Sequence, residues 1–229
     1  MNWENDLSNF SGICRLFPLG GVVMFPHAVV PLHVFEPRYR QMSADALASD
    51  RMVTIVQPRL VQPTADLSGE PALEAVGCLG RVINHERLKD GRYKYLLVGL
   101  RRVRLHKELV VPTLYRQAAG DLMDEIEDLD LDASERGELL SLFRDLAKQR
   151  NMLDDEMTSL LDSTLETGVL ADIIAHSLGV PIEMKQALLD EPLVSVRVRK
   201  LTRVLRGLVG RPMSASQGDR TYPPPFSPN

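Results

Sequence analysis

An uncharged stretch of twenty residues near the start of the chain limits what this sequence can fold into more than any other feature. It runs from Leu16 to Phe35, between Arg15 and Glu36, and three prolines and one Gly-Gly pair interrupt it. Exposing so much apolar surface to water is unfavourable, so the stretch must be buried in a core, in a membrane or against a partner.

The composition of this stretch argues against a membrane span and against a secretory signal. About twenty residues is the length that a spanning helix needs. Pro18, Pro26 and Pro31 would break such a helix repeatedly, and His27 and His33 would place polar rings in the bilayer. The residues before the stretch include two acidic side chains and no basic one before Arg15, whereas a signal begins with a positive region. We therefore expect short buried strands in a soluble, cytoplasmic protein.

The first half of the chain is predicted to be rich in β-structure. Strand-type residues fill 13–19 and 22–25 on either side of Gly20-Gly21, and 29–35 resumes extended structure. Pro37 suits the first position of a helix that runs to about Ser49. Asp90-Gly91 predicts a type I′ hairpin turn. Further strands are expected at 52–57, 76–86, 93–98, 100–109 and 113–119, and a polar loop at 58–74 is a candidate contact region.

The second half is predicted to be helical. Asp132 and Glu135 have the spacing of a capping box, from which a helix should run to about Arg150. Apolar stripes then recur at helical spacing, with Gly168 ending one helix and Pro181 beginning another. The expected organisation is a loose arm at 1–12, a β subdomain at 13–123, a helical bundle at 124–210 and a disordered Pro- and Ser-rich tail at 211–229.

Charge is distributed unevenly along the chain. Residues 1–118 contain fifteen basic and eleven acidic side chains, residues 119–193 contain five and nineteen, and residues 194–229 contain seven and one. An acidic middle next to a basic last helix suggests that these faces pack against or steer each other, although a surface pair contributes less than about 1 kcal/mol. The acidic middle would repel a polyanion such as RNA.

Three segments carry a family resemblance. They read LFPLGGVVMFP followed by VPLHVFEPRYRQM, then VGCLGRVINHERLKDGRYKYLLVGLRRVRL, and finally GVLADIIAHSLGVPIEMKQALLDEPLVSVRVRKLTRVL. Together they resemble the N-terminal, substrate-engaging domain of ATP-dependent Lon proteases over roughly Leu16 to Val209. The resemblance implies an α+β fold, in which a PUA-like β pseudo-barrel with a short helix precedes a C-terminal α-helical bundle. It also implies a stand-alone domain, because the sequence after Gly210 does not continue into an ATPase.

A polypeptide-binding surface is expected at two bends of the uncharged stretch, where apolar groups could face a partner. Its candidate residues are Met24, Phe25, Pro26, His27, Phe35, Glu36, Pro37, Arg38 and Tyr39. Glu36 could accept a partner's amide. The alternative for Glu36 is a helix-start charge that interacts with the helix dipole or pairs with Arg40.

A candidate basic face lies on the strand that follows Gly99. It consists of Arg101, Arg102, Arg104 and Lys107. With nearby tyrosines these side chains could contact phosphates and stacked bases of RNA, since PUA-like folds elsewhere bind RNA. Alternating arginines also keep the exposed face of a sheet soluble and protect its edge.

The sequence contains no recognisable catalytic constellation. No G-x-x-x-x-G-K-[ST] segment is present to hold nucleotide phosphates, and Met213-Ser214-Ala215 has no lysine to activate the serine. The five histidines have no metal-ligand spacing, so we expect no cofactor and no metal. Cys14 and Cys78 are expected to be buried and reduced, although their spacing leaves a disulfide open.

The function predicted from the sequence is binding without catalysis. The protein would engage unfolded or extended polypeptide in protein quality control. The alternatives are a regulatory adaptor that contacts a folded protease or ATPase, and RNA binding through the basic face. Nucleic acid and membrane are the partners that the sequence disfavours.

Overall fold

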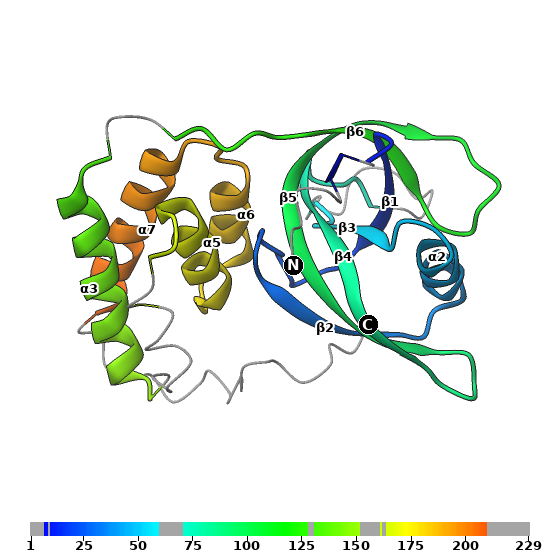
Figure 1. Ribbon diagram of the computed structural model, residues 1–229, viewed down its shortest axis with the longest axis horizontal. Coiled ribbons are helices and arrows are strands. Elements are labelled where there is room, and N and C mark those ends of the chain that lie inside the picture. Colours follow the sequence, from blue (N-terminus) through cyan, green and yellow to red (C-terminus); the bar gives the residue numbers. More distant parts are fainter. Residues whose placement is uncertain are drawn as a thin grey trace. The chain divides into compact units, whose positions relative to one another are not determined.

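The computed structural model describes residues 7–8, 10–59, 71–127, 131–151, 161 and 164–209 (Figure 1). The chain divides into two compact units, with the boundary between Met123 and Asp124. The predicted arm at 1–12 lies mostly outside the described residues, and the predicted tail at 211–229 lies wholly outside them. Of one predicted apolar stripe, Met157 and Leu160 lie outside the described residues, and Leu161 and Leu165 lie within them. No described helix is long and apolar enough to cross a bilayer.

In the described residues with named elements, the first unit is a ring of strands and a helix. Its elements are β1 (Ile13–Pro18), β2 (Val29–Val34), α2 (Pro37–Leu47), β3 (Met52–Val56), β4 (Val76–Arg87), β5 (Tyr93–Leu109) and β6 (Gln117–Leu122). The strand order is β2-β5-β4-β3-β1-β6, and β6 also pairs with β5, which closes the ring. Only β1 and β3 pair in parallel; the other pairs are antiparallel. The expected α+β class is confirmed.

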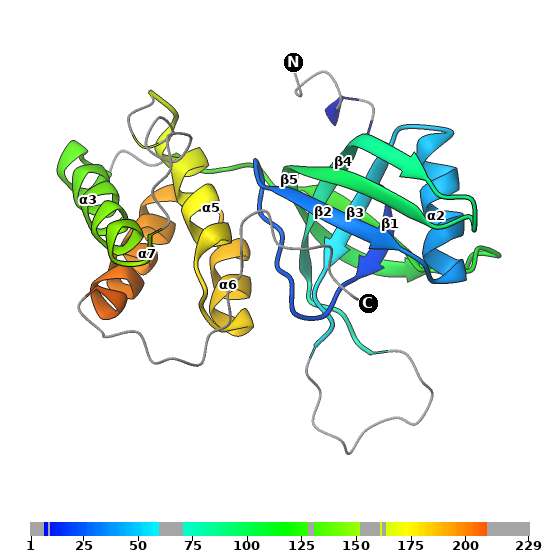
Figure 2. The ribbon, with the colours of Figure 1, turned by 90° about the horizontal axis from the view of Figure 1, so that it is seen from below.

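The uncharged stretch fills this ring. Leu16, Phe17, Leu32 and Val34 on its strands are almost completely buried. Helix α2 lies across one end of the strands (Figure 2) and buries its apolar stripe there. The Tyr39 ring of α2 stacks against Phe17, with the ring centroids 4.3 Å apart. The uncharged stretch is therefore buried in a protein core, and α2, which follows it, contributes further side chains to the same core.

One predicted strand does not form. Residues 22–25 have no regular secondary structure and belong to no described strand, yet Met24 and Phe25 are 1% and 0% exposed. The segment ends in a tight turn at Pro26 and His27, where the Ala28 N–H donates to the Phe25 carbonyl and His27 has a φ of 65°. Pro26 has no N–H for a sheet, so the segment inserts side chains into the ring instead of adding a strand to it.

The β4–β5 hairpin differs from the predicted type I′ turn. Leu88 N–H donates to the Arg92 carbonyl and Gly91 N–H to the Leu88 carbonyl, at 2.8 and 2.9 Å. Gly91 has a φ of 83°, whereas Asp90 is not among the described residues with positive φ. This is a three-residue loop with glycine in the left-handed position. The longer loop spares Asp90 a left-handed backbone and lets its carboxylate accept from the Arg92 N–H at 3.0 Å.

Strand boundaries also differ beyond the hairpin. The two segments predicted on either side of Gly99 form a single strand, β5, of 17 residues. The following strand, β6, begins at Gln117 and not at Thr113, because Thr113 uses its hydroxyl to cap a loop by donating to the Tyr115 carbonyl at 2.8 Å.

We predict that Gly99→Ala strongly destabilises the first unit. A Cβ on Gly99 would lie 2.1 Å from the Phe25 carbonyl oxygen and 2.9 Å from the carbonyl carbon, so backbone would have to move to relieve the overlap. The expected loss is at least about 2 kcal/mol of unfolding free energy, in the range of overpacked cores. Urea unfolding measures it. Gly20→Ala is the control, because nothing lies within 4 Å of its Cβ. Equal midpoints for the two variants would contradict this packing.

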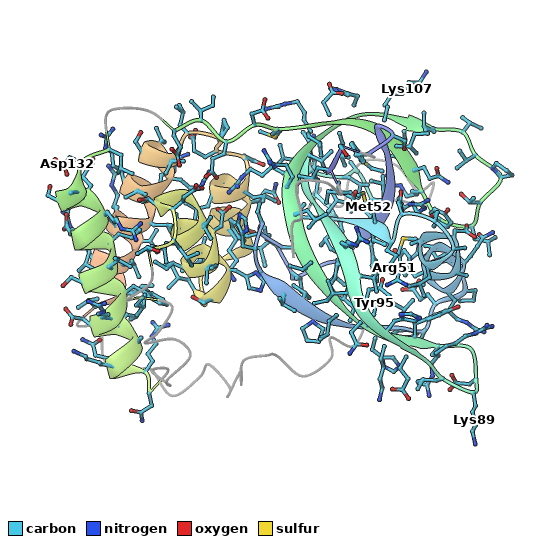
Figure 3. All side chains as sticks on the ribbon, viewed as in Figure 1. Arg51, Met52, Lys89, Tyr95, Lys107 and Asp132 are labelled. Carbon is cyan, nitrogen blue, oxygen red and sulfur yellow. The ribbon has the colours of Figure 1, made fainter. Side chains whose placement is uncertain are left out.

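The second unit consists of helices. They are α3 (Ala133–Gln149), α5 (Thr167–Ser177), α6 (Ile182–Leu189) and α7 (Val194–Leu208). The predicted capping box begins α3, where the Asp132 carboxylate (labelled in Figure 3) accepts from the Glu135 N–H at 2.8 Å and the Glu135 carboxylate accepts from the Asp132 N–H at 3.4 Å. Arg199 of α7 also reaches Glu135, at 2.7 Å, so the cap of α3 is tied to α7.

A buried ion cluster holds the second unit together. Arg197 of α7 is 0% exposed and lies 3.2 Å from Asp172 of α5, which is also buried. A second guanidinium nitrogen contacts the carboxylate of Glu125, and a third donates to the Glu191 carbonyl at 3.0 Å. Gly168 lies in the first turn of α5 and not at the predicted helix end. A side chain at this position would overlap the Glu125 carboxylate, because a Cβ there would lie 1.8 Å from one of its oxygens.

The chain that precedes the helices takes part in this unit. Ile126 N–H donates to the Pro192 carbonyl at 3.0 Å, and Val194 N–H donates to the Ile126 carbonyl at 3.1 Å. The acidic segment before α3 is therefore anchored to the helical unit at Glu125 and Ile126. Its residues 128–130 lie outside the described part of the chain.

We predict that Arg197→Met destabilises the helical unit by about 3–5 kcal/mol, because it leaves the Asp172 carboxylate buried without its partner. Arg206→Met is the matched control: Arg206 pairs with Glu138 on an exposed face, where the loss should not exceed about 1 kcal/mol. Helical circular dichroism during urea unfolding measures both. Equal destabilisation would show that the buried cluster is not stabilising.

Candidate functional site

The structure separates the residues predicted to form a binding surface. Four of them are buried in the first unit: Met24, Phe25, Pro26 and Tyr39. Their expected exposure is wrong, because the bends that carry them turn inward to fill the ring. The remaining predicted residues are exposed or half-buried: His27, Phe35, Glu36, Pro37 and Arg38.

The corner between β2 and α2 consists of residues 35–38. Pro37 begins the helix, as predicted, and Glu36 is its N-cap without a side-chain capping bond. Glu36 pairs with Arg38, with 2.8 Å between the carboxylate and a guanidinium nitrogen, and not with Arg40. The Arg38 guanidinium also lies 4.6 Å from the centroid of the Tyr39 ring. The charges of Glu36 and Arg38 therefore largely cancel at this corner.

An open depression of about 350 Å³ adjoins the corner, between α2 and the turn end of the β4–β5 hairpin. Its lining residues are Pro37, Arg40, Gln41, Ala44, Arg87, Gly91 and Tyr93. Except for Pro37, the sequence prediction missed them. The α2 residues that line the depression, at positions 37, 40, 41 and 44, have the spacing of one helix face, and this spacing is the sequence signal that groups them.

The edge of β2 adjoins the same corner. Gly99 N–H donates to the Ala28 carbonyl at 2.8 Å, and hydrogen-bonded positions alternate along an antiparallel pair. Val30 and Leu32 thus direct their backbone groups to β5, while Val29 and Pro31 direct theirs to the other side. Pro31, which has no N–H, sits where it costs no hydrogen bond to β5. Among the described strands, β2 pairs with β5 alone.

The predicted basic face is not continuous. Arg102 is 3% exposed and Arg101 is half-buried, whereas Arg104 and Lys107 are exposed. Figure 3 shows Lys107 pointing away from the first unit. The reason is that β5 runs through the core for most of its length, and a register shift between Leu105 and Glu108 changes which side chains face outward. Two exposed cations remain where four were expected.

A short apolar loop between β5 and β6 was not anticipated as a surface feature. Val110 is fully exposed, and Leu114 is 64% exposed. The loop is held by the Leu114 N–H, which donates to the Gln41 side-chain oxygen at 2.7 Å, and by the Tyr115 hydroxyl, which donates to Asp45 at 2.9 Å. This contact fixes the side chain of Gln41 beside the depression.

Groups that could carry out chemistry are not gathered at these surfaces. Cys14 and Cys78 are buried free thiols, and burial raises the pKa of Cys14 to about 11. In the described residues, no three histidine, cysteine or acidic side chains lie close enough together to hold a metal ion. Most of the loop at 58–74, a candidate contact region, lies outside the described residues.

Comparison with known proteins decides the family. Residues 13–207 match the model of the ATP-dependent protease La (LON) substrate-binding domain. The chain belongs to this Lon domain family. A Lon protease of Xanthomonas oryzae is 32% identical over 220 residues, which cover 88% of this chain and 25% of that protein. A Lon protease of Azospirillum brasilense is 30% identical, over 84% of this chain and 24% of that protein.

Solved structures of Lon domains share the fold. The crystal structure of a Lon N-terminal domain protein from Xanthomonas campestris has a TM-score of 0.61 at 24% identity and covers 83% of this chain and 97% of that one. The N-terminal domain of a Mycobacterium avium complex Lon protease has a TM-score of 0.67 at 16% identity, over 85% and 98%. The chain spans about a quarter of the length of the curated Lon proteases it matches, and the match lies in the substrate-binding domain.

We predict that the main effect of Phe25→Ala is a loss of folding stability, not the loss of an exposed binding residue. Its ring is fully buried, so truncation should cost about 3–5 kcal/mol of unfolding free energy. His27→Gly, two residues away, should change it by no more than about 1 kcal/mol, because glycine accepts the positive φ of 65°. Urea unfolding of both variants measures this. A small loss for Phe25→Ala would mean that residues 24–26 leave the core in solution.

Proposed function

We propose that this Lon-family domain binds extended or unfolded polypeptide and carries out no catalysis itself. The observation that supports this most directly is the outer edge of β2, which faces away from the ring and ends at a half-apolar corner. The family description, a substrate-binding domain, supports protein as the class of partner.

Addition of a strand explains how one surface could accept many sequences. An extended chain lying along β2 would hydrogen-bond to the outward backbone groups of the half-buried Val29, and backbone contacts do not depend on side-chain identity. Phe35 and Pro37, at the end of β2, supply apolar surface for alternate side chains of the bound chain. Affinity would come from the backbone, and a weak sequence preference from the corner.

Binding of RNA receives less support from the first unit. Of the four residues in the predicted basic face, Arg102 is buried and Arg101 half-buried. A groove that follows a nucleic-acid backbone needs a continuous row of cations with stacking rings. Tyr93 and Tyr95, on the same strand, are 5% and 2% exposed, so their rings do not offer a stacking surface.

The test is binding of a fluorescently labelled, reduced and carboxymethylated model protein. Val29→Pro removes the outward N–H of β2, and Val29→Thr keeps it at nearly the same side-chain volume. Val29→Pro should weaken binding by about three- to tenfold, the effect of one backbone hydrogen bond of about 1 kcal/mol. Val29→Thr should bind like the unmodified chain, and circular dichroism confirms that both variants are folded.

Two results would count against the proposal. Absence of binding at high micromolar concentration, with the domain folded, would exclude polypeptide binding as its function. Equal affinity of the proline and threonine variants would exclude strand addition at β2. Crosslinking in cell extract separates the adaptor alternative, since an adaptor should capture one dominant folded partner and a polypeptide binder many. Affinity that falls tenfold or more between about 50 and 200 mM salt would favour RNA instead.

A further inference from the structure

We infer that the depression between α2 and the β4–β5 hairpin is a carboxylate-binding site for the polypeptide that the domain engages. The inference rests on the proposed function, because it assigns the ligand class of a site next to β2. It depends on two arginines that line the depression, Arg40 of α2 and Arg87 of β4.

Neither arginine forms an ion pair with a described residue. The carboxylates near the depression are paired with other arginines: Glu36 with Arg38 at 2.8 Å, and Asp90 with Arg92 at 2.7 Å. Asp90 senses the charge of Arg40, but the hydrogen bonds from Arg92 are the main reason that its pKa lies below the usual value. The two guanidinium groups that face the depression are thus left to bind an anion from outside.

Both guanidinium groups are held in place by their surroundings. A Cβ on Gly91 would lie 2.1 Å from Nη2 of Arg40, so the missing side chain of this glycine makes the space that the guanidinium occupies. The Arg87 guanidinium lies 5.8 Å from the centroid of the Tyr93 ring. Planar guanidinium groups fixed in this way match the two oxygens of a carboxylate and lose little freedom when they bind it.

The depression lies next to the C-terminal end of β2. Tyr93 of β5 pairs with Val34, the last residue of β2, on one side and with Arg87 of β4 on the other. Pro37, which lines the depression, follows the end of β2 by three residues. A chain that extends along β2 past Val34 would therefore run toward Pro37 and the depression that Pro37 lines.

The lining favours a carboxylate of a polypeptide over a free anion. Pro37, Ala44 and Tyr93 add apolar surface beside the arginines, which suits the carbon atoms that carry a carboxylate. Two sources have this chemistry: the C-terminal carboxylate of a chain and the side chain of an internal glutamate or aspartate.

Three acetylated twelve-residue peptides of one uncharged sequence distinguish these sources. The first ends in a free carboxylate, the second in an amide, and the third in an amide but with two internal glutamates. Fluorescence anisotropy should show at least one acidic peptide binding about tenfold more tightly than the amide, the usual effect of a charged hydrogen-bonding pair. The acidic peptide that gains affinity identifies the source.

The double variant Arg40→Gln/Arg87→Gln should remove this preference while leaving the affinity for the amide peptide unchanged. The charge-matched control is Lys89→Gln/Lys107→Gln. Both lysines are exposed on the first unit, do not line the depression and point into solvent (Figure 3). The control should keep the tenfold preference. An equal loss in both double variants would mean that general charge attracts the peptides, and it would overturn the site. Arg87→Gln alone serves if the double variant does not fold.

The outcomes separate this site from the proposed function. If the three peptides bind with equal affinity, the carboxylate site is wrong and polypeptide binding stands. If none of them binds, the proposed function fails, and the site is then tested by titrating N-acetylglutamate while recording the arginine Nε–H signals by NMR. Shifts confined to Arg40 and Arg87 would support the site, and unchanged signals would exclude it.

Discussion

Closure of the first unit depends on β5, because this one strand pairs with three others. Its first half lies between β2 and β4, and its second half lies between β4 and β6. Gly99 stands where the halves meet, so close to the Phe25 carbonyl that no other residue fits. The same contact holds residues 22–25 in the core. Ring closure, burial of the uncharged stretch and the position of β2 at the edge thus have a common origin.

The sequence predicted the parts of the fold that depend on local patterns. Residues close together in the sequence determine the capping box at Asp132, the helix that begins at Pro37 and the strands on either side of Asp90-Gly91. Residues 22–25 were misjudged because strand propensity cannot tell a paired strand from buried coil. The segment becomes a paired strand only where a neighbouring strand has an unpaired edge. The presence of such an edge depends on how distant parts of the chain pack in the ring.

The candidate site shows the same limit more strongly. Met24, Phe25 and Tyr39 were expected at the surface because bends often carry exposed apolar groups, but a small ring needs them inside. Arg40 and Arg87 are 47 positions apart in sequence, and only the packing of α2 beside the hairpin brings them to one depression. Pairing with Arg40 was one alternative considered for Glu36; Glu36 pairs with Arg38 instead, which leaves Arg40 available.

The anchoring of Glu125 and Ile126 has a consequence for dividing the chain. The helical unit begins before its first named helix. Arg197 pairs with two carboxylates, and one of them, that of Glu125, belongs to the segment that leads into α3. A fragment cut at Ala133 would keep all four described helices and lose half of the negative charge around a fully buried guanidinium. A stable helical fragment should therefore begin at Asp124, because such a fragment keeps the acidic segment whose Glu125 neutralises Arg197.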